Sequence, residues 1–184
     1  MKTKKVVCNE LEIKGDLLNP GFSIYLLKIT LLNKTYFYIG MTGDPYYPSA
    51  RSAFHRIAGH LELNKRSTQN RLHRALNKKG IKTNADRKEL NIKMYHFPIE
   101  GFVEWPHDDM SADTIRNNEN SKHYSNYKEV QKKVCSLENA IIIHLNNTAE
   151  TKCKVLNTTK GKQLGNEKIP FHEIYDKIIS ICNE

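Results

Sequence analysis

The segment SIYLLKITLLNKTYFYIG, residues 23–40, decides the fold that the sequence predicts. Its two halves, Ile24 to Thr30 and Thr35 to Gly40, are rich in β-branched and aromatic residues, and a short connection separates them. This pattern predicts a β-hairpin. Successive side chains of a strand point to opposite faces, so we expect Tyr36 and Tyr38 to share one face and their neighbours to share the other.

The length and the charge of the chain indicate one domain with a polyanionic partner. A chain of 184 residues is long enough to bury a core and to carry an insertion. The formal net charge is +9, and residues 51–93 hold twelve Lys and Arg against three acidic side chains, so the remainder is about neutral. A local basic surface is typical of proteins that bind nucleic acid, whereas a merely soluble basic protein usually spreads its charge.

The cysteines and the apolar segments indicate a cytoplasmic protein. Cys8, Cys135, Cys153 and Cys182 are far apart, and none forms a zinc-binding pair with another Cys or a nearby His. This distribution argues against a disulfide framework and for a reducing compartment. No apolar stretch approaches the length of a membrane span, and the Lys-rich start lacks the hydrophobic core of a signal peptide.

Two helices are expected between the hairpin and a third strand over residues 91–98. Ser49 is the expected N-cap of the first helix. The second helix starts near residues 67–68 and ends at Gly80, because glycine is favoured just after a helix. The apolar side chains of these helices are, in chain order, Ala50, Phe54, Ile57 and Leu61, then Leu72, Ala75 and Leu76.

The remaining segments differ in composition. A leader over residues 1–20 precedes the hairpin. Residues 99–127 hold six acidic side chains against two basic ones and show no repeating apolar pattern, so we expect an acidic insertion or an ordered loop there. A long helix is predicted from about residue 128 to 146, and a packing helix from 171 to 182, each with an apolar stripe.

Arg51 and His55 are candidate site residues. Their spacing of four places them about 40° apart on one face of the predicted first helix, at the edge of its apolar stripe. A guanidinium binds a phosphate through two hydrogen bonds, and a neutral imidazole relays a proton. The pair alone is a weak signal, because many solvated helix surfaces carry such a pair.

Glu138 is a stronger candidate, because it falls inside an apolar arc of the predicted long helix. The arc consists of Val134, Leu137, Ile141, Ile142 and Leu145. A buried carboxylate costs several kcal/mol unless it is paired, protonated or bound to a metal. Two interpretations stay open at this point: a core glutamate that contacts an Arg or Lys, or a ligand of a cation.

The tripeptides Ser23–Tyr25 and Tyr38–Gly40 resemble the pair of strand motifs that defines the GIY-YIG nucleases. Ser23 stands where the first glycine of that family usually is. Residues 71–80 are similar to the second helix of the phage intron-homing endonucleases in the family. The resemblance extends over about residues 23–157, with the insertion excluded.

Further elements of the family follow in the same order along the chain. The site residues that the resemblance implies are Tyr25, Tyr38, Arg51, His55, Glu138 and Asn157. Two departures stand out. The loop before Arg51 is a few residues longer than usual, and the second histidine of some homing enzymes falls at Ser67, with His60 nearby.

The resemblance implies an α+β fold in which helices flank a small three-stranded antiparallel sheet, and the hydrolysis of a phosphodiester bond with one metal ion. Tyr25 would accept the proton of the attacking water, with help from His55, the metal or the charge of Arg51. Arg51 would stabilise charge on the phosphate, and Glu138 would hold Mg²⁺ or Mn²⁺. Tyr38 would position the water or the phosphate, and Asn157 would hold the geometry of the site.

The expected partner is nucleic acid, most of all double-stranded DNA. Five basic residues are expected to follow its backbone without reading sequence: Arg56, Arg71, Arg74, Lys78 and Lys79. The chain stops soon after Asn157, which favours a compact nuclease of the restriction, phage or defence type over a homing enzyme with a separate targeting domain. We expect the insertion around Trp105 to read the substrate or to join two copies in a homodimer.

Two other classes of function are weighed against the nuclease. A catalytically silent nucleic-acid-binding module that keeps the fold accounts for the basic segment, but it gives no reason for Glu138 to lie in an apolar arc. A structural or acid-binding partner protein explains neither Tyr25 nor Tyr38.

Overall fold

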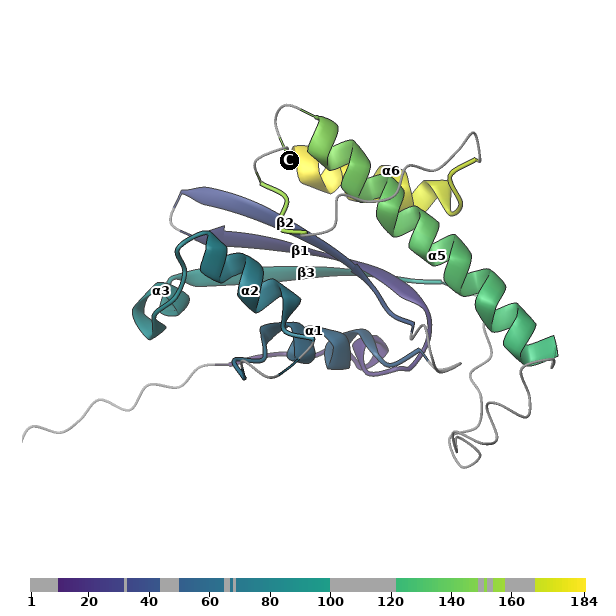
Figure 1. The fold of residues 1–184 in the computed structure, drawn as a ribbon, viewed down its shortest axis with the longest axis horizontal. Helices are drawn as coiled ribbons and strands as arrows, with labels where there is room; N and C mark the ends of the chain where they lie inside the picture. The colour runs from purple at the N-terminus through teal and green to yellow at the C-terminus, as the bar shows by residue number, and fades with distance from the viewer. Residues whose placement is uncertain are drawn as a thin grey trace, which may run out of the picture.

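The structure, a computed structural model, has an α+β architecture with one three-stranded antiparallel sheet (Figure 1). It describes residues 10–31, 33–43, 50–64, 67, 69–99, 122–148, 151, 154–157 and 168–184. The elements in chain order are η1 (Gly15–Leu17), β1 (Ser23–Leu31), β2 (Lys34–Met41), α1 (Ala53–Leu61), α2 (Arg71–Lys78), α3 (Asn84–Lys88), β3 (Leu90–Pro98), α5 (Lys122–Asn147) and α6 (His172–Asn183). The predicted α+β class with a three-stranded antiparallel sheet is confirmed.

β1 is the central strand of the sheet, and the strand order is β2-β1-β3. Both neighbours run antiparallel to it, so that Tyr25 lies opposite Gly40 on β2 and opposite His96 on β3. The hairpin and the third strand agree with the predicted segments to within one residue at each end.

The two faces of the sheet carry separate hydrophobic cores. Tyr25 and Tyr38 belong to the core that α1 and α2 cover, and Tyr36 packs against the same core. Phe37 and Ile39 belong to the core that α5 and α6 cover. The predicted alternation along β2 is confirmed, and Figure 1 shows α1 and α2 below the sheet with α5 and α6 above it.

α1 begins later than the sequence predicts. Ser52 is its N-cap, since the Ser52 Oγ accepts a hydrogen bond from the His55 backbone N–H at 3.3 Å, whereas Ser49 lies outside the described residues. Ala50 is buried, as its place in the apolar stripe requires, but it precedes the helix. The prediction that Arg51 lies on this helix is therefore wrong, because the capping serine follows it.

α2 buries the predicted residues Leu72, Ala75 and Leu76. It begins at Arg71, three residues or more after the predicted start. Gly80 has a φ of +93°, the left-handed conformation that ends helices and that glycine adopts without strain.

α3 is a short helix that the sequence analysis did not predict. A capping box forms it: the Thr83 Oγ accepts from the Asp86 N–H at 3.1 Å, and the Asp86 carboxylate accepts from the Thr83 N–H at 2.8 Å. The helix turns the chain from α2 into β3.

α5 begins at Lys122, so the prediction of irregular chain up to residue 127 is wrong at its end. Tyr127 is fully buried, and its ring centroid lies 5.0 Å from that of Phe22. This contact with a residue distant in the sequence stabilises the part of α5 that precedes residue 128. Residues 100–121, with Trp105 in the insertion, lie outside the described residues.

α6 agrees with the predicted packing helix to within one residue at each end. It buries Ile178 and Ile181 against the same core as α5. None of the helices in the described part of the chain has the length and apolar character needed to cross a membrane.

The ring of Tyr25 lies directly across the backbone of Gly40. Tyr25 is fully buried, and a Cβ atom added to Gly40 would overlap with the Tyr25 Cζ and Oη atoms. A glycine inside a strand often marks such a close approach. Gly40, the last residue of the Tyr38–Gly40 motif, has no side chain, and the Tyr25 ring occupies the space that a side chain would fill.

Gly40→Ala is expected to lower the free energy of unfolding by about 1–3 kcal/mol, because the added methyl group overpacks the contact with Tyr25. The measurement is urea unfolding of the parent and the variant. Gly15→Ala is the matched control, since a Cβ atom at Gly15 meets nothing within 4 Å.

Shortening the tyrosine provides a second control. In a Tyr25→Leu background, Gly40→Ala should cost clearly less, since the overlapping atoms are gone. Equal stability of the Gly40→Ala and Gly15→Ala proteins would contradict the close approach.

Candidate active site

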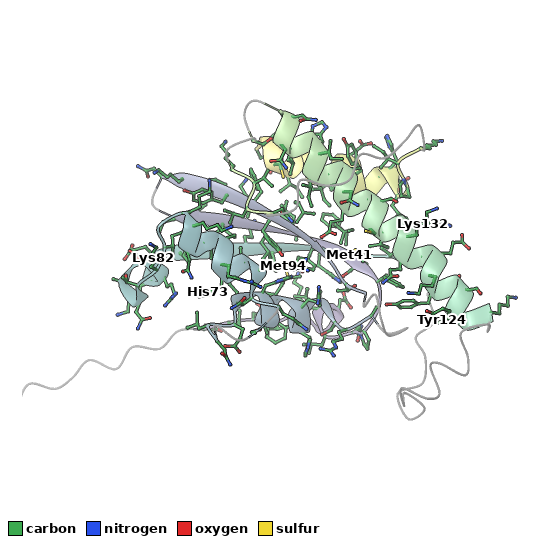
Figure 2. All side chains as sticks on the ribbon, viewed as in Figure 1. Met41, His73, Lys82, Met94, Tyr124 and Lys132 are labelled. Atoms are coloured by element: carbon green, nitrogen blue, oxygen red, sulfur yellow. The ribbon has the colours of Figure 1, made fainter. Side chains whose placement is uncertain are left out.

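A cavity of about 620 Å³ lies where the end of β2 meets α1, α2 and α5. Tyr25 and Tyr38 line it from the strands, and Arg56 and Arg71 line it from α1 and α2. Met41, which also lines the cavity, lies at the end of β2 beside α5 in Figure 2. The lining residues from α5 are Lys128, Gln131, Lys132, Cys135, Ser136 and Glu138.

His60 and Tyr25 form a hydrogen-bonded pair at this cavity. The His60 Nε2 lies 2.7 Å from the Tyr25 Oη, and the His60 Nδ1 lies 3.0 Å from the carbonyl oxygen of Gln69. Because a carbonyl only accepts, Nδ1 carries the proton and donates to Gln69, and Nε2 accepts from the Tyr25 hydroxyl. The buried imidazole therefore directs its lone pair at the phenol.

The charge state of His60 agrees with this tautomer. Burial lowers the pKa of His60 to about 4, and the positive charge of Arg56 contributes in the same direction. The imidazole is thus neutral near pH 7 and has a free lone pair.

Both tyrosines are protonated phenols in the free protein. Burial raises the pKa of Tyr25 well above its ordinary value, against the opposing charge of Arg56. Burial also raises the pKa of Tyr38, and the negative charge of Glu138 raises it further. A cation bound near Glu138 would cancel that last contribution, so the ionisation of the phenols is coupled to the charge at Glu138.

Glu138 lines the cavity from α5 as a half-buried carboxylate. Burial raises its pKa to about 7, although the positive charges of Arg71 and Arg56 act in the opposite direction. Among the residues that the structure describes, it forms no ion pair or hydrogen bond. Within that part of the chain, the interpretation of Glu138 as a core residue in direct contact with an Arg or Lys does not apply.

Arg56 is half-buried and has an unsatisfied donor. Its Nε is buried and has no hydrogen-bond partner among the described residues. Leaving a buried donor unpaired costs about 1–3 kcal/mol, and an anion in the cavity would relieve that cost through a charge-assisted hydrogen bond. With Arg71 also lining the cavity, two guanidinium groups are available to one phosphate.

The donor set suits a divalent cation of the magnesium type. Mg²⁺ keeps several of its waters and is usually bound through one or two carboxylates together with phosphate oxygens of the substrate. Glu138 offers one such carboxylate in a cavity with room for waters. The neighbouring charges of Arg56 and Arg71 repel a cation, so a metal would bind most tightly together with an anionic substrate.

Arg51 and His55, two of the residues predicted for the site, lie outside the cavity. Both are exposed, and the Arg51 Nη1 donates a hydrogen bond to the His55 Nε2 at 3.0 Å. Arg56 and His60 have the same spacing of four and lie five residues later, on the side of α1 that faces the cavity. The repeated spacing of four is the signal in the sequence that could have identified His60 as a site residue.

Asn157 fixes β2 from its outer edge and does not line the cavity. Residues 154–157 run beside β2, where Phe37 forms a parallel bridge with Val155. The Asn157 amide continues this pairing: Nδ2 donates to the Ile39 carbonyl at 2.7 Å, and Oδ1 accepts from the Ile39 N–H at 2.9 Å. These two bonds hold the backbone next to Tyr38.

Of the five basic residues expected to contact nucleic acid, Arg56 and Arg71 line the cavity. The other three, Arg74, Lys78 and Lys79, are exposed on α2 or at its end. Arg71, Arg74 and Lys78 follow one another at spacings of three and four, so they form a stripe along one side of α2 that begins at the cavity. We call these three residues the α2 stripe.

Glu138→Gln is expected to stabilise the metal-free protein, and more so at pH 8 than at pH 5. The folded pKa of about 7 exceeds the ordinary value of 4.5, so between these values the folded state keeps a proton that the unfolded state releases. Stability therefore falls as the pH rises. The advantage of the variant should widen by about 2 kcal/mol between pH 5 and pH 8, measured by urea unfolding in EDTA.

Glu129→Gln is the control for this measurement. Glu129 also lies on α5 but is exposed, and it pairs with Lys133 at 2.6 Å. Its replacement should not reproduce the widening. A Glu138→Gln advantage that stays constant with pH would show that the carboxylate is not held in the buried setting described above.

The comparisons with known proteins give no family for this chain. No protein-family model matches it, and neither a curated protein nor a solved structure does.

Proposed function

We propose that this chain is a divalent-metal-dependent nuclease of the GIY-YIG kind, which hydrolyses phosphodiester bonds of DNA. The observation that carries the proposal is the set of unsatisfied groups in one cavity. Arg56 has an unpaired buried Nε, and Glu138 has no partner among the described residues, although both lie beside the Tyr25–His60 pair. Opposite charges that share a cavity without pairing leave room for a phosphate and a cation between them.

In the proposed reaction, Arg56 and His60 take the parts that the sequence analysis expected of Arg51 and His55. Arg56 and Arg71 bind the scissile phosphate and stabilise the negative charge that develops on it. Tyr38 lies beside them and positions the phosphate or the attacking water. Glu138 would hold a divalent cation, which would supply Lewis-acid chemistry at the phosphate and the leaving oxygen.

Tyr25 moves the proton of the attacking water. As its Oη takes that proton, its own proton passes along the 2.7 Å hydrogen bond to the His60 Nε2. The low pKa of His60 opposes this transfer in the free protein. A bound phosphate would raise that pKa because its negative charge offsets the charge of Arg56, so the relay becomes favourable only when substrate is present.

The test is a cleavage assay with plasmid DNA, single-stranded DNA and RNA, with and without Mg²⁺. Tyr25→Phe should lower the cleavage rate by roughly 10² or more, because it removes only the hydroxyl that carries the proton. Glu138→Gln should abolish the dependence on metal along with the activity. Arg56→Ala and His60→Ala should be severe rate defects.

Arg51→Ala and His55→Ala are the matched controls, with the same residue types at the same spacing outside the cavity. Both should cut at close to the parental rate. If the Arg51 and His55 variants lose activity while the Arg56 and His60 variants keep it, Arg51 and His55 are the site residues instead. A parent that binds DNA but cuts no substrate with any divalent metal would identify a silent binding module. The relative cleavage of the three substrates tests the predicted preference for DNA. The mass of the protein in solution tests the predicted homodimer.

A further inference from the structure

We infer that α5 supplies a second phosphate-binding surface, in which Lys128 and Lys132 hold the substrate strand on the side of the cavity opposite the α2 stripe. This inference rests on the proposed function and extends it to the path of the nucleic acid. The sequence analysis assigned no contact to either lysine.

Both lysines line the cavity on the part of α5 that precedes Glu138. Lys128, Lys132 and Glu138 all line the cavity, and they lie on one helix at spacings of four and six. With a rise of about 1.5 Å per residue, Lys132 lies about 9 Å and Lys128 about 15 Å before Glu138 along the helix axis. These separations suit contacts with phosphates neighbouring the scissile one. Figure 2 shows Lys132 partway along α5 and Tyr124 near its beginning.

The side of α5 opposite the two lysines packs on the core. Val134, Leu137 and Ile141 are fully buried against the sheet. Besides the lysines and Glu138, α5 lines the cavity with Gln131, Cys135 and Ser136. Both lysines therefore lie away from the part of α5 that packs on the sheet.

The charges of the cavity point to a polyanion. In the part of the chain that the structure describes, four cationic side chains line it, Arg56, Arg71, Lys128 and Lys132, against the one carboxylate of Glu138. Among the described residues, no ion pair neutralises Lys132. The Lys128 Nζ lies 5.4 Å from the centroid of the Tyr124 ring, in a cation–π contact. One phosphate cannot balance this excess, whereas several successive phosphates of a strand can.

The neighbouring Lys133 shows the contrast. It does not line the cavity, and its Nζ already pairs with Glu129 at 2.6 Å. Lys133 is therefore a control with the same residue type on the same helix. Lys177, exposed on α6, provides a second one.

The experiment measures the affinity for a DNA duplex against salt concentration in EDTA for three double variants and the parent. Lys128→Ala/Lys132→Ala should bind more weakly, with a log–log salt slope shallower by up to about 1.8, since each lost phosphate contact contributes about 0.9. Lys133→Ala/Lys177→Ala loses the same net charge and should keep the parental slope. In cleavage assays the α5 variant should raise KM by a larger factor than it lowers kcat, because its lysines do not touch the reacting atoms.

Arg74→Ala/Lys78→Ala, in the α2 stripe, separates the possible failures. If this variant weakens binding while the α5 variant keeps the parental slope, the α5 surface is overturned and the proposed function stands. If the parent binds no DNA, the proposed function fails and the α5 surface fails with it. Equal loss of slope in the α5 variant and in its Lys133/Lys177 control would also overturn the inference, because general charge would then explain it.

Discussion

The hydrogen bond from the Tyr25 Oη to the His60 Nε2, 2.7 Å long, is the contact on which the arrangement of this protein depends. It is reached only because Gly40 lets the Tyr25 ring cross the neighbouring strand. His60 in turn donates to the Gln69 carbonyl, just before α2 begins. One buried polar chain thus joins the hairpin, α1 and the start of α2. Any shift of the ring would leave two buried polar groups unpaired, at a cost of about 1–3 kcal/mol each.

The same cavity keeps groups that weaken the fold. An ionised Glu138 without a partner among the described residues and a buried Arg56 Nε without an acceptor both oppose stability. Sequences usually agree with their folds at every level, and departures concentrate at functional sites. The two departures lie together, beside the Tyr25–His60 pair, and this coincidence is the physical reason to regard the cavity as a site.

The sequence predicted what depends on local pattern and missed what depends on packing. The β-branched and aromatic runs around Tyr25 and Tyr38 were enough for the hairpin and its faces, and the helical wheel placed Glu138 on the correct side of α5. The two Arg-His pairs of the α1 region share one spacing, so periodicity cannot distinguish them. The capping of α1 at Ser52 and its packing on the sheet decide that Arg56 and His60 face inward. The early start of α5 likewise depends on a contact with Phe22, far away in the sequence.

The electrostatics of the cavity link metal, substrate and proton transfer in the proposed reaction. In the free protein, burial and the charge of Glu138 raise the pKa of Tyr38, and burial with the charge of Arg56 lowers the pKa of His60. A cation at Glu138 would offset the negative charge that raises the pKa of the phenols, and a phosphate would offset the positive charge that lowers the pKa of His60. A bound phosphate would reduce the repulsion between the cation and the two arginines, Arg56 and Arg71. A bound cation would reduce the repulsion between the phosphate and Glu138. Metal and phosphate should therefore bind cooperatively, and only their joint presence brings the phenol and the imidazole toward pKa values at which a proton can pass between them.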